Sequence, residues 1–177
     1  MLSEWNNKFN LVGKSTLQDP VRSHILDSIQ ISKYISNKNA KIIDIGTGAG
    51  FPGLVLSIYD FVNLYVVDSN SKKINFIKHV KNKLKIPIQI LHSRIEDIKH
   101  HNFDYVISRA LAKLDKLLLY SSLISSKKTK LIFLKGEMIN NEISYAKQNW
   151  DFHHIKHKSI SDNRGSVILI KDYKQKI

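Results

Sequence analysis

The chain has 177 residues, a length that suits one domain with at most a small appendage. Apolar residues make up 42% and charged residues 24%, which are ordinary values for a globular protein and exclude collagen-like and disordered chains. The absence of cysteine excludes structural disulfides, cysteine-based zinc sites and a thiolate nucleophile.

The charge balance is strongly basic, with 28 Lys and Arg against 15 Asp and Glu, a net charge of +13. Such a charge attracts polyanions and favours a nucleic acid or an anionic surface as partner. The alternative is compositional, because abundant Lys, Ile and Asn are also expected from an AT-rich genome. Only four residues are arginine, at positions 22, 94, 109 and 164, so most of the positive charge is lysine.

The N-terminal stretch Met1–Phe9 has neither the basic start nor the apolar core of a signal peptide. No apolar run approaches the roughly 18 residues that span a bilayer. We therefore expect a cytoplasmic protein without a membrane partner. Residues 1–36 are predicted to form an N-terminal helical extension, and residues 37–177 the main domain.

Short apolar runs rich in β-branched residues alternate with longer segments of helical periodicity. The strand-like runs cover 41–45, 63–68, 86–91, 103–108, 130–135 and 166–170. Helices are predicted over 21–35, 71–84, 111–124 and 137–150. In the first of these helices, the apolar residues that recur near the helical period are Val21, Ile25, Ile29 and Ile31.

The alternation of strand and helix after residue 40 predicts an α/β fold, with a parallel sheet covered by helices on both faces. Asp44 and Asp68 interrupt or end two of the apolar runs. Ligands of open α/β sheets bind at the carboxyl ends of the strands. These two carboxylates therefore mark the expected ligand-binding edge.

The segment between the first strand and the next helix, residues 44–53, reads Asp-Ile-Gly-Thr-Gly-Ala-Gly-Phe-Pro-Gly. Glycines at such a turn permit a tight bend and a close approach by a ligand, and Pro52 suits a first helical turn. A dinucleotide fingerprint, G-x-G-x-x-G, needs glycine at position 51, where Phe51 stands. A turn that serves only helix–strand packing is the alternative.

The observed G-x-G-x-G with an acid two residues before it resembles motif I of class I S-adenosylmethionine-dependent methyltransferases. Asp68 follows Asp44 by 24 residues and ends the next strand. A carboxylate at that place can accept both hydroxyls of a ribose. We therefore expect a nucleoside-containing cofactor at this turn.

The absence of two kinds of residue restricts which methylation reactions this chain can catalyse. Without cysteine, carbon-5 methylation of pyrimidines has no nucleophile. The strand 103–108 is followed by Arg109-Ala110 and not by the proline-containing motif that exocyclic-amine methyltransferases usually carry. A target with a free lone pair and no proton to lose suits such a site, and guanine N7 is one. The enzyme would then supply positioning and water exclusion more than base catalysis.

Several motifs in order resemble one family, the ribosomal RNA small subunit methyltransferase G proteins, also called glucose-inhibited division protein B. The matching segments are Trp5-Asn6, Asn10-Leu11, His24 to Ser28, Gly46 to Gly53, Asp68-Ser69, Lys72-Lys73, Phe76, Ser93 to Glu96, Ser108 to Ala110 and Leu134 to Gly136. Two features depart from the family. Ser23 stands where relatives have a basic residue before the histidine, and relatives usually carry a helical segment before Trp5.

The resemblance implies a Rossmann-like, mostly parallel methyltransferase sheet with S-adenosylmethionine as cofactor. It implies a monomeric bacterial enzyme that methylates N7 of a guanine in a decoding-centre loop of 16S rRNA, as RNA or within the small ribosomal subunit. The resemblance, together with the glycine turn and the carboxylate expected to bind a ribose, gives the expected cofactor contacts: Gly46, Gly48, Phe51, Asp68, Ile95, Glu96 and Arg109. The expected RNA contacts are Arg94, Arg109, Lys135 and His24. No catalytic residue is assigned, and no metal is expected.

Structural alternatives exist for these residues. Arg94 and Arg109 would otherwise form strand-end salt bridges, Lys135 would be a solvated lysine, and His24 a packed, hydrogen-bonded histidine. Two other functions stay open on the residues alone. One is an NAD-linked oxidoreductase, which Phe51 disfavours. The other is a non-catalytic basic RNA-binding protein, which would retain RNA without binding a cofactor.

Overall fold

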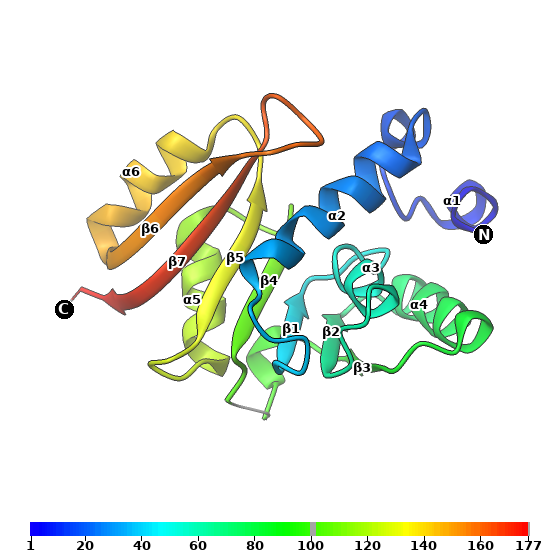
Figure 1. Cartoon of the computed structure of the whole chain (residues 1–177), viewed down its shortest axis with the longest axis horizontal. Coiled ribbons are helices and arrows are strands. Elements are labelled where there is room, and N and C mark those ends of the chain that lie inside the picture. The colour runs from blue at the N-terminus through cyan, green and yellow to red at the C-terminus, as the bar shows by residue number, and fades with distance from the viewer. Residues whose placement is uncertain (100–101, 177) are drawn as a thin grey trace.

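A single seven-stranded sheet with the strand order β3-β2-β1-β4-β5-β7-β6 organises the molecule (Figure 1). The computed structural model describes residues 1–99 and 102–176. All strand pairs from β3 to β5 are parallel, and β7 is antiparallel to both of its neighbours. The strands are β1 (Ile42–Ile45), β2 (Leu64–Asp68), β3 (Ile88–His92), β4 (Tyr105–Arg109), β5 (Lys130–Lys135), β6 (Trp150–Lys158) and β7 (Ser166–Gln175).

The expectation of a mostly parallel α/β sheet is confirmed. Residues of β1 are buried on both faces, as expected for a central parallel strand covered by two helical layers. The reversal at β7 follows from the short connection 159–165, because parallel neighbours need a crossover of a dozen or more residues. The strand predicted over 166–170 extends to Gln175, where polar residues pair with the edge strand β6.

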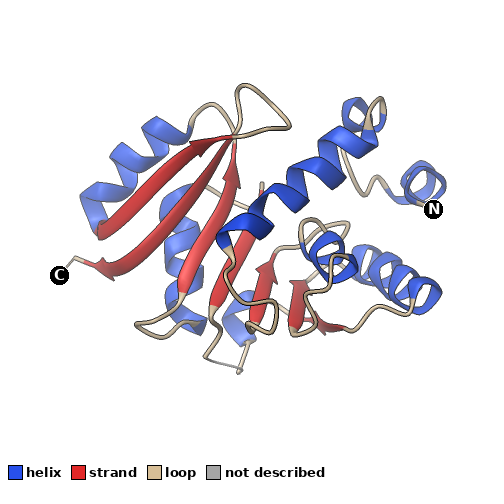
Figure 2. Cartoon of the chain, viewed as in Figure 1, coloured by secondary structure: helices blue, strands red, loops and turns tan. Residues whose placement is uncertain are grey.

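Helices flank the sheet on both sides (Figure 2). Their bounds are α1 (Leu2–Phe9), η1 (Lys14–Leu17), η2 (Val21–Leu26), α2 (Asp27–Ile29), η3 (Gln30–Tyr34), α3 (Gly53–Ile58), α4 (Ser71–Leu84), η4 (Ile95–Asp97), α5 (Leu114–Ile124) and α6 (Ile139–Asn149). One apolar core cluster joins the sheet to η3, α3 and α4, and a second joins it to α5 and α6.

The helix predicted over 21–35 forms, but its buried face differs from the predicted one. Val21 is 66% exposed and Ile25 is 44% exposed. The residues that face the sheet and the cleft include His24, Ser28 and Ile31. The prediction of an apolar stripe was wrong at its first two positions, because the buried face of this segment carries the polar residues His24 and Ser28 and does not include Val21 and Ile25.

The N-terminal segment packs onto the same core as the sheet. Leu11, Ile31 and Ile35 belong to the cluster that contains β1 and β2, and Trp5 contacts Phe76 of α4 with 5.5 Å between ring centroids. The domain boundary at residue 36 stays a prediction. In the part of the chain that the structure describes, no helix is long and apolar enough to cross a membrane.

Candidate functional site

A cleft of about 1060 Å³ lies at the carboxyl ends of β1, β2, β4 and β5, on the side where η2 crosses the sheet. Parallel strands all deliver their last residues to this edge, so segments far apart in sequence meet there. The glycine turn 46–49, Asp68 and Arg109 line the cleft together. All four arginines of the chain also line it. The cleft therefore gathers the residues that the sequence singled out.

Asp44, in β1 just before the turn, is completely buried. Its Oδ2 accepts hydrogen bonds from the Thr47 hydroxyl at 2.5 Å and from the Gly53 amide at 2.9 Å. Burial raises its pKa to about 7, although both hydrogen bonds oppose that shift. The carboxylate thus ties the start of the turn to the first residue of α3, and its role here is to shape the turn.

Three glycines of the turn have positive φ, a conformation that a side chain disfavours. At Gly48, a Cβ atom would meet only the Gly46 carbonyl oxygen, at 4.0 Å, so open space lies above the backbone. At Gly46, a Cβ atom would lie 2.4 Å from the Leu111 side chain. The turn therefore presents bare backbone to the cleft at Gly48 and packs against the β4–α5 connection at Gly46.

Asp68 ends β2 and faces the same turn. Its Oδ2 accepts the Gly48 amide at 3.0 Å, and its Oδ1 accepts the Asn70 amide at 2.9 Å. Lys73 lies 3.8 Å from Oδ2. Each carboxylate oxygen has two lone pairs, so both keep capacity for a hydroxyl donor. Asp68 is therefore placed to hold a diol beside Gly48, as a ribose-binding carboxylate must.

The segment after β3 contributes Arg94, Ile95 and Glu96 to the cleft wall. Ile95 is buried, whereas Arg94 and Glu96 are exposed at the start of η4. The structure thus brings these three residues to the same cleft as Asp68. An apolar residue beside an exposed carboxylate suits a flat base with donor groups at its edge.

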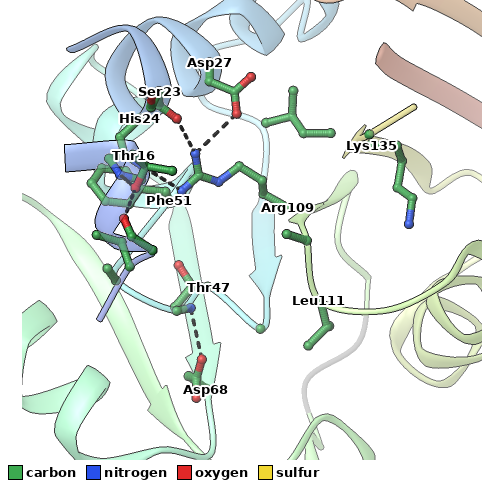
Figure 3. A pocket seen from close by; sticks show the side chains of 18 of the residues that line it. Thr16, Ser23, His24, Asp27, Thr47, Phe51, Asp68, Arg109, Leu111 and Lys135 are labelled. Atoms are coloured by element: carbon green, nitrogen blue, oxygen red, sulfur yellow. Dashed lines mark hydrogen bonds and ion pairs between the residues drawn. The ribbon is translucent and has the colours of Figure 1, made fainter. Parts of the chain in front are cut away.

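Arg109, at the end of β4, is held by the helical segment opposite (Figure 3). Its Nη1 donates to the Ser23 carbonyl oxygen at 2.8 Å and lies 3.3 Å from Asp27 Oδ2. Its Nη2 lies 2.9 Å from Nδ1 of His24. The guanidinium also lies over the Phe51 ring, 5.2 Å from its centroid. The salt-bridge alternative for Arg109 is thus realised inside the cleft.

His24 stacks on Phe51 with 4.7 Å between ring centroids and is only 2% exposed. Burial, and then the charge of Arg109, lower the pKa of His24 to about 4. The ring is therefore neutral near pH 7, with Nδ1 accepting from Arg109 and Nε2 donating to the Thr16 hydroxyl at 3.0 Å. This geometry fits the packed-histidine alternative, and it leaves neither ring nitrogen free for the RNA contact expected of His24.

Lys135 ends β5 and lines the cleft, but its side chain is only 7% exposed. Its ammonium lies 2.6 Å from Glu142 of α6 and donates to the Ala112 carbonyl oxygen at 2.8 Å. The solvated-lysine alternative was wrong, because both contacts draw the side chain inward. An RNA contact by this ammonium would have to compete with Glu142.

Asp27 is a residue of the site that sequence reasoning missed. Its Oδ2 meets Arg109, and its Oδ1 accepts the Ser161 hydroxyl at 2.5 Å and the Gln30 amide nitrogen at 2.9 Å. The carboxylate thereby joins the cleft to the β6–β7 connection 159–165. A signal existed, since His24 and Asp27 are three residues apart and therefore neighbours on one helix face.

Arg22 and Arg164 also line the cleft and were not expected there. The Nε of Arg22 donates to the Ser161 carbonyl oxygen at 2.7 Å, which ties η2 to the β6–β7 connection. Arg164 is exposed on that connection, in a turn closed by the hydrogen bond from the Gly165 amide to the Asp162 carbonyl oxygen at 2.9 Å. No local signal in the sequence places these two residues in the same cleft as Arg109, because their position there depends on the tertiary fold.

Comparison with solved structures agrees with this architecture. A ribosomal protein L11 methylase from Lactobacillus delbrueckii subsp. bulgaricus superposes with a TM-score of 0.68, at 16% identity, over 91% of this chain and 80% of that one. A SAM-dependent methyltransferase from Aquifex aeolicus gives a TM-score of 0.66, at 16% identity, over 88% and 94% of the two chains. At such identities the likeness shows the fold, which is that of class I methyltransferases.

Sequence relatives are more specific. Residues 1–168 match the family model described as GidB, rRNA small subunit methyltransferase G. The chain is similar to a protein named ribosomal RNA small subunit methyltransferase G from Rickettsia prowazekii, with 35% identity over 97% of this chain and 89% of the relative. It is 38% identical to one of the same name from Orientia tsutsugamushi, over 97% and 85% of the two chains. The chain therefore belongs to the rRNA small subunit methyltransferase G family.

Proposed function

We propose that this protein transfers the methyl group of S-adenosylmethionine to N7 of a guanine in 16S rRNA. The observation that carries the proposal is the cleft in which the bare Gly48 backbone, the Asp68 carboxylate and Arg109 converge, in a chain of this family. The oxidoreductase and non-catalytic alternatives lack support, since the family and the fold relatives are methyltransferases.

The residues present fit the cofactor. The open space above Gly48 admits the close approach of a ligand to backbone, and a side chain there would fill it. Asp68 would accept the ribose hydroxyls, and Ile95 with Glu96 would border the adenine. When bound, the cofactor supplies an electrophilic methyl group on a positively charged sulfur. Phe51, 8% exposed, would close the apolar side of the turn.

The chemistry at guanine N7 needs little proton transfer. In the proposed transfer, the N7 lone pair would attack the methyl carbon as the carbon–sulfur bond breaks, and the positive charge would move from sulfur to the base. No proton leaves N7, so positioning and exclusion of water are the main demands. Arg109 meets the first demand because its guanidinium is fixed by Ser23, His24 and Asp27 at the edge of the cleft.

The RNA partner is matched by the charge of the chain, +13 overall, and by the arginines along the cleft. Arg94 is exposed and meets the requirement for an RNA contact. A stacked guanine is hard to reach, so the base would leave its stack to enter the cleft. We further propose that the enzyme works as a monomer, because one chain supplies every residue named here.

The direct test is to express the protein in bacteria whose 16S rRNA lacks 7-methylguanosine and to analyse that rRNA by mass spectrometry. We expect one new 7-methylguanosine in 16S rRNA. Purified protein with labelled S-adenosylmethionine, offered naked 16S rRNA or intact small subunits, then identifies the preferred substrate. Methylation of a different base atom, or binding of NADH and not of S-adenosylhomocysteine, would overturn the proposal.

A further inference from the structure

The β4–α5 connection, residues 110–113, forms the part of the cleft wall that packs against the glycine turn. Ala110 and Leu111 line the cleft, and Leu111 packs directly over Gly46. Ala110 has a φ of 53°, a left-handed conformation that a non-glycine residue adopts only when its surroundings hold it there. The position of this connection is therefore imposed by neighbouring elements.

The two ends of the connection are held by different partners. At its start, Arg109 is fixed by the helical segment of Ser23 and Asp27. At its other end, Lys135 donates to the Ala112 carbonyl oxygen at 2.8 Å. Glu142 accepts the Leu114 amide at 2.8 Å, at the first residue of α5.

Lys135 and Glu142 also hold each other. Their charged atoms are 2.6 Å apart, and their side chains are 7% and 17% exposed. Charge-assisted hydrogen bonds of this length are strong, and the low exposure protects them from water. One ion pair from β5 and α6 therefore binds a carbonyl near the end of the connection and an amide at the start of α5, two residues apart.

We infer that Lys135 and Glu142 are positioning residues for methyl transfer, which hold the β4–α5 connection against the glycine turn. This inference rests on the proposed function and assigns Lys135 a task other than contacting RNA. Figure 3 shows Leu111 and Lys135 on the side of the cleft away from His24 and Phe51, so this pair supports the wall that the helical segment does not reach.

The two roles of Lys135 predict opposite results for Glu142→Gln. If Lys135 binds a phosphate of RNA, removal of the competing carboxylate frees its ammonium and tightens RNA binding. If the pair positions the connection, kcat falls by about 10-fold or more while the Kd for RNA and the KM for S-adenosylmethionine change little, because small misplacements cost large factors in rate. Tighter RNA binding with an unchanged kcat would overturn the inference.

A double-mutant cycle separates a shared task from two independent ones. Lys135→Met keeps most of the length of the unbranched side chain and removes its charge. We expect Lys135→Met and Glu142→Gln together to lower kcat by little more than either change alone, since both break the same support. If the fold-reductions in kcat of the two single variants multiplied in the double variant, the two residues would act independently and the assignment would be contradicted. The matched control is Glu137→Gln, an exposed carboxylate between β5 and α6 that does not line the cleft, which should leave kcat unchanged.

Loss of folded protein would mimic loss of positioning, so kcat is expressed per site that binds S-adenosylhomocysteine. Amide hydrogen exchange at residues 111–114 gives a readout that does not depend on activity. It should accelerate in Glu142→Gln and not in Glu137→Gln. If the wild-type protein methylated no RNA while exchange at residues 111–114 still accelerated in Glu142→Gln alone, the proposed function would fail. The finding that Lys135 and Glu142 support the β4–α5 connection would then stand. Unchanged exchange together with an unchanged kcat would reject the assignment.

Discussion

At the scale of single residues, the cleft depends on a few polar groups whose charge state the fold controls. Asp68 is placed by two backbone amides, and Arg109 by a carbonyl, an imidazole and a carboxylate. His24 and Asp44 are buried, and burial shifts their pKa values in the direction that favours the neutral form. These groups lead to two predictions.

Asp68→Ala should weaken S-adenosylhomocysteine binding by roughly 10- to 100-fold, because hydrogen bonds to a charged group contribute about 1.5–3 kcal/mol. Calorimetric titration measures the change. The control is Asp60→Ala, which removes an exposed carboxylate that lies 3.6 Å from Lys38 and does not line the cleft. Equal affinities of the two variants would show that Asp68 does not hold the cofactor.

Folding stability should fall below about pH 6.5 because of His24. Its pKa is about 4 in the folded protein, against an ordinary value of 6.5 that the unfolded chain keeps, so the unfolded chain takes up the proton first. The contribution of His24 to stability is present above pH 6.5 and is lost as the pH falls toward 4, by about 2 kcal/mol at pH 5.

Denaturant unfolding at pH 7.5 and pH 5 measures this loss. Since Asp44 has a raised pKa and titrates in the opposite sense, the comparison is between wild type and His24→Gln. The difference between their two pH dependences isolates His24. Parallel pH dependences would mean that the imidazole titrates normally in the folded protein.

At the scale of elements, Asp44 joins the glycine turn to α3, because its carboxyl group accepts hydrogen bonds from both. Gly53 begins α3, and its amide donates to Asp44. A Cβ atom at this position would lie 2.6 Å from Val66 and 2.9 Å from Asp44 Oδ2. The close packing of α3 on β2 therefore requires glycine there.

Gly53→Ala should lower the free energy of unfolding by about 1–3 kcal/mol, as overpacking of a filled core does. Gly136→Ala is the matched control, because nothing lies within 4 Å of a Cβ atom at that position. It should leave stability unchanged or raise it by up to about 1 kcal/mol through the unfolded chain. Thermal and denaturant unfolding of both variants provide the comparison.

At the scale of the whole molecule, the charge of +13 is spread over many lysines, while the arginines gather at one cleft. Arg94 and Arg164 are exposed there on different segments of the chain. Arginine suits phosphate because its planar fork can donate two parallel hydrogen bonds. The arrangement favours an RNA strand that crosses the mouth of the cleft.

RNA affinity should therefore fall with salt, with a log–log slope of about −0.7 for each phosphate neutralised on a single strand. Arg94→Gln and Arg164→Gln should each make the slope shallower by about 0.7. Lys38→Gln, which removes an exposed charge that does not line the cleft, serves as the control. A flat salt dependence of the wild-type protein would remove the electrostatic basis for RNA binding.

The sequence alone determined the α/β class, the glycine turn and the place of Asp68, because these follow from local patterns: β-branched runs, glycines after a strand and an acid at the end of the next strand. The cofactor type was predicted from the resemblance of the turn to motif I of class I methyltransferases. Predicted bounds held for 71–84 and 130–135, where periodicity and end signals agree. The tertiary structure alone decided which partners Arg109, Lys135 and His24 meet. Asp27, Glu142 and Ser161 are distant in sequence from at least one of their partners. They become neighbours only because the helical segment 21–34, α6 and the β6–β7 connection pack around the edge of the sheet where Arg109 and Lys135 end their strands.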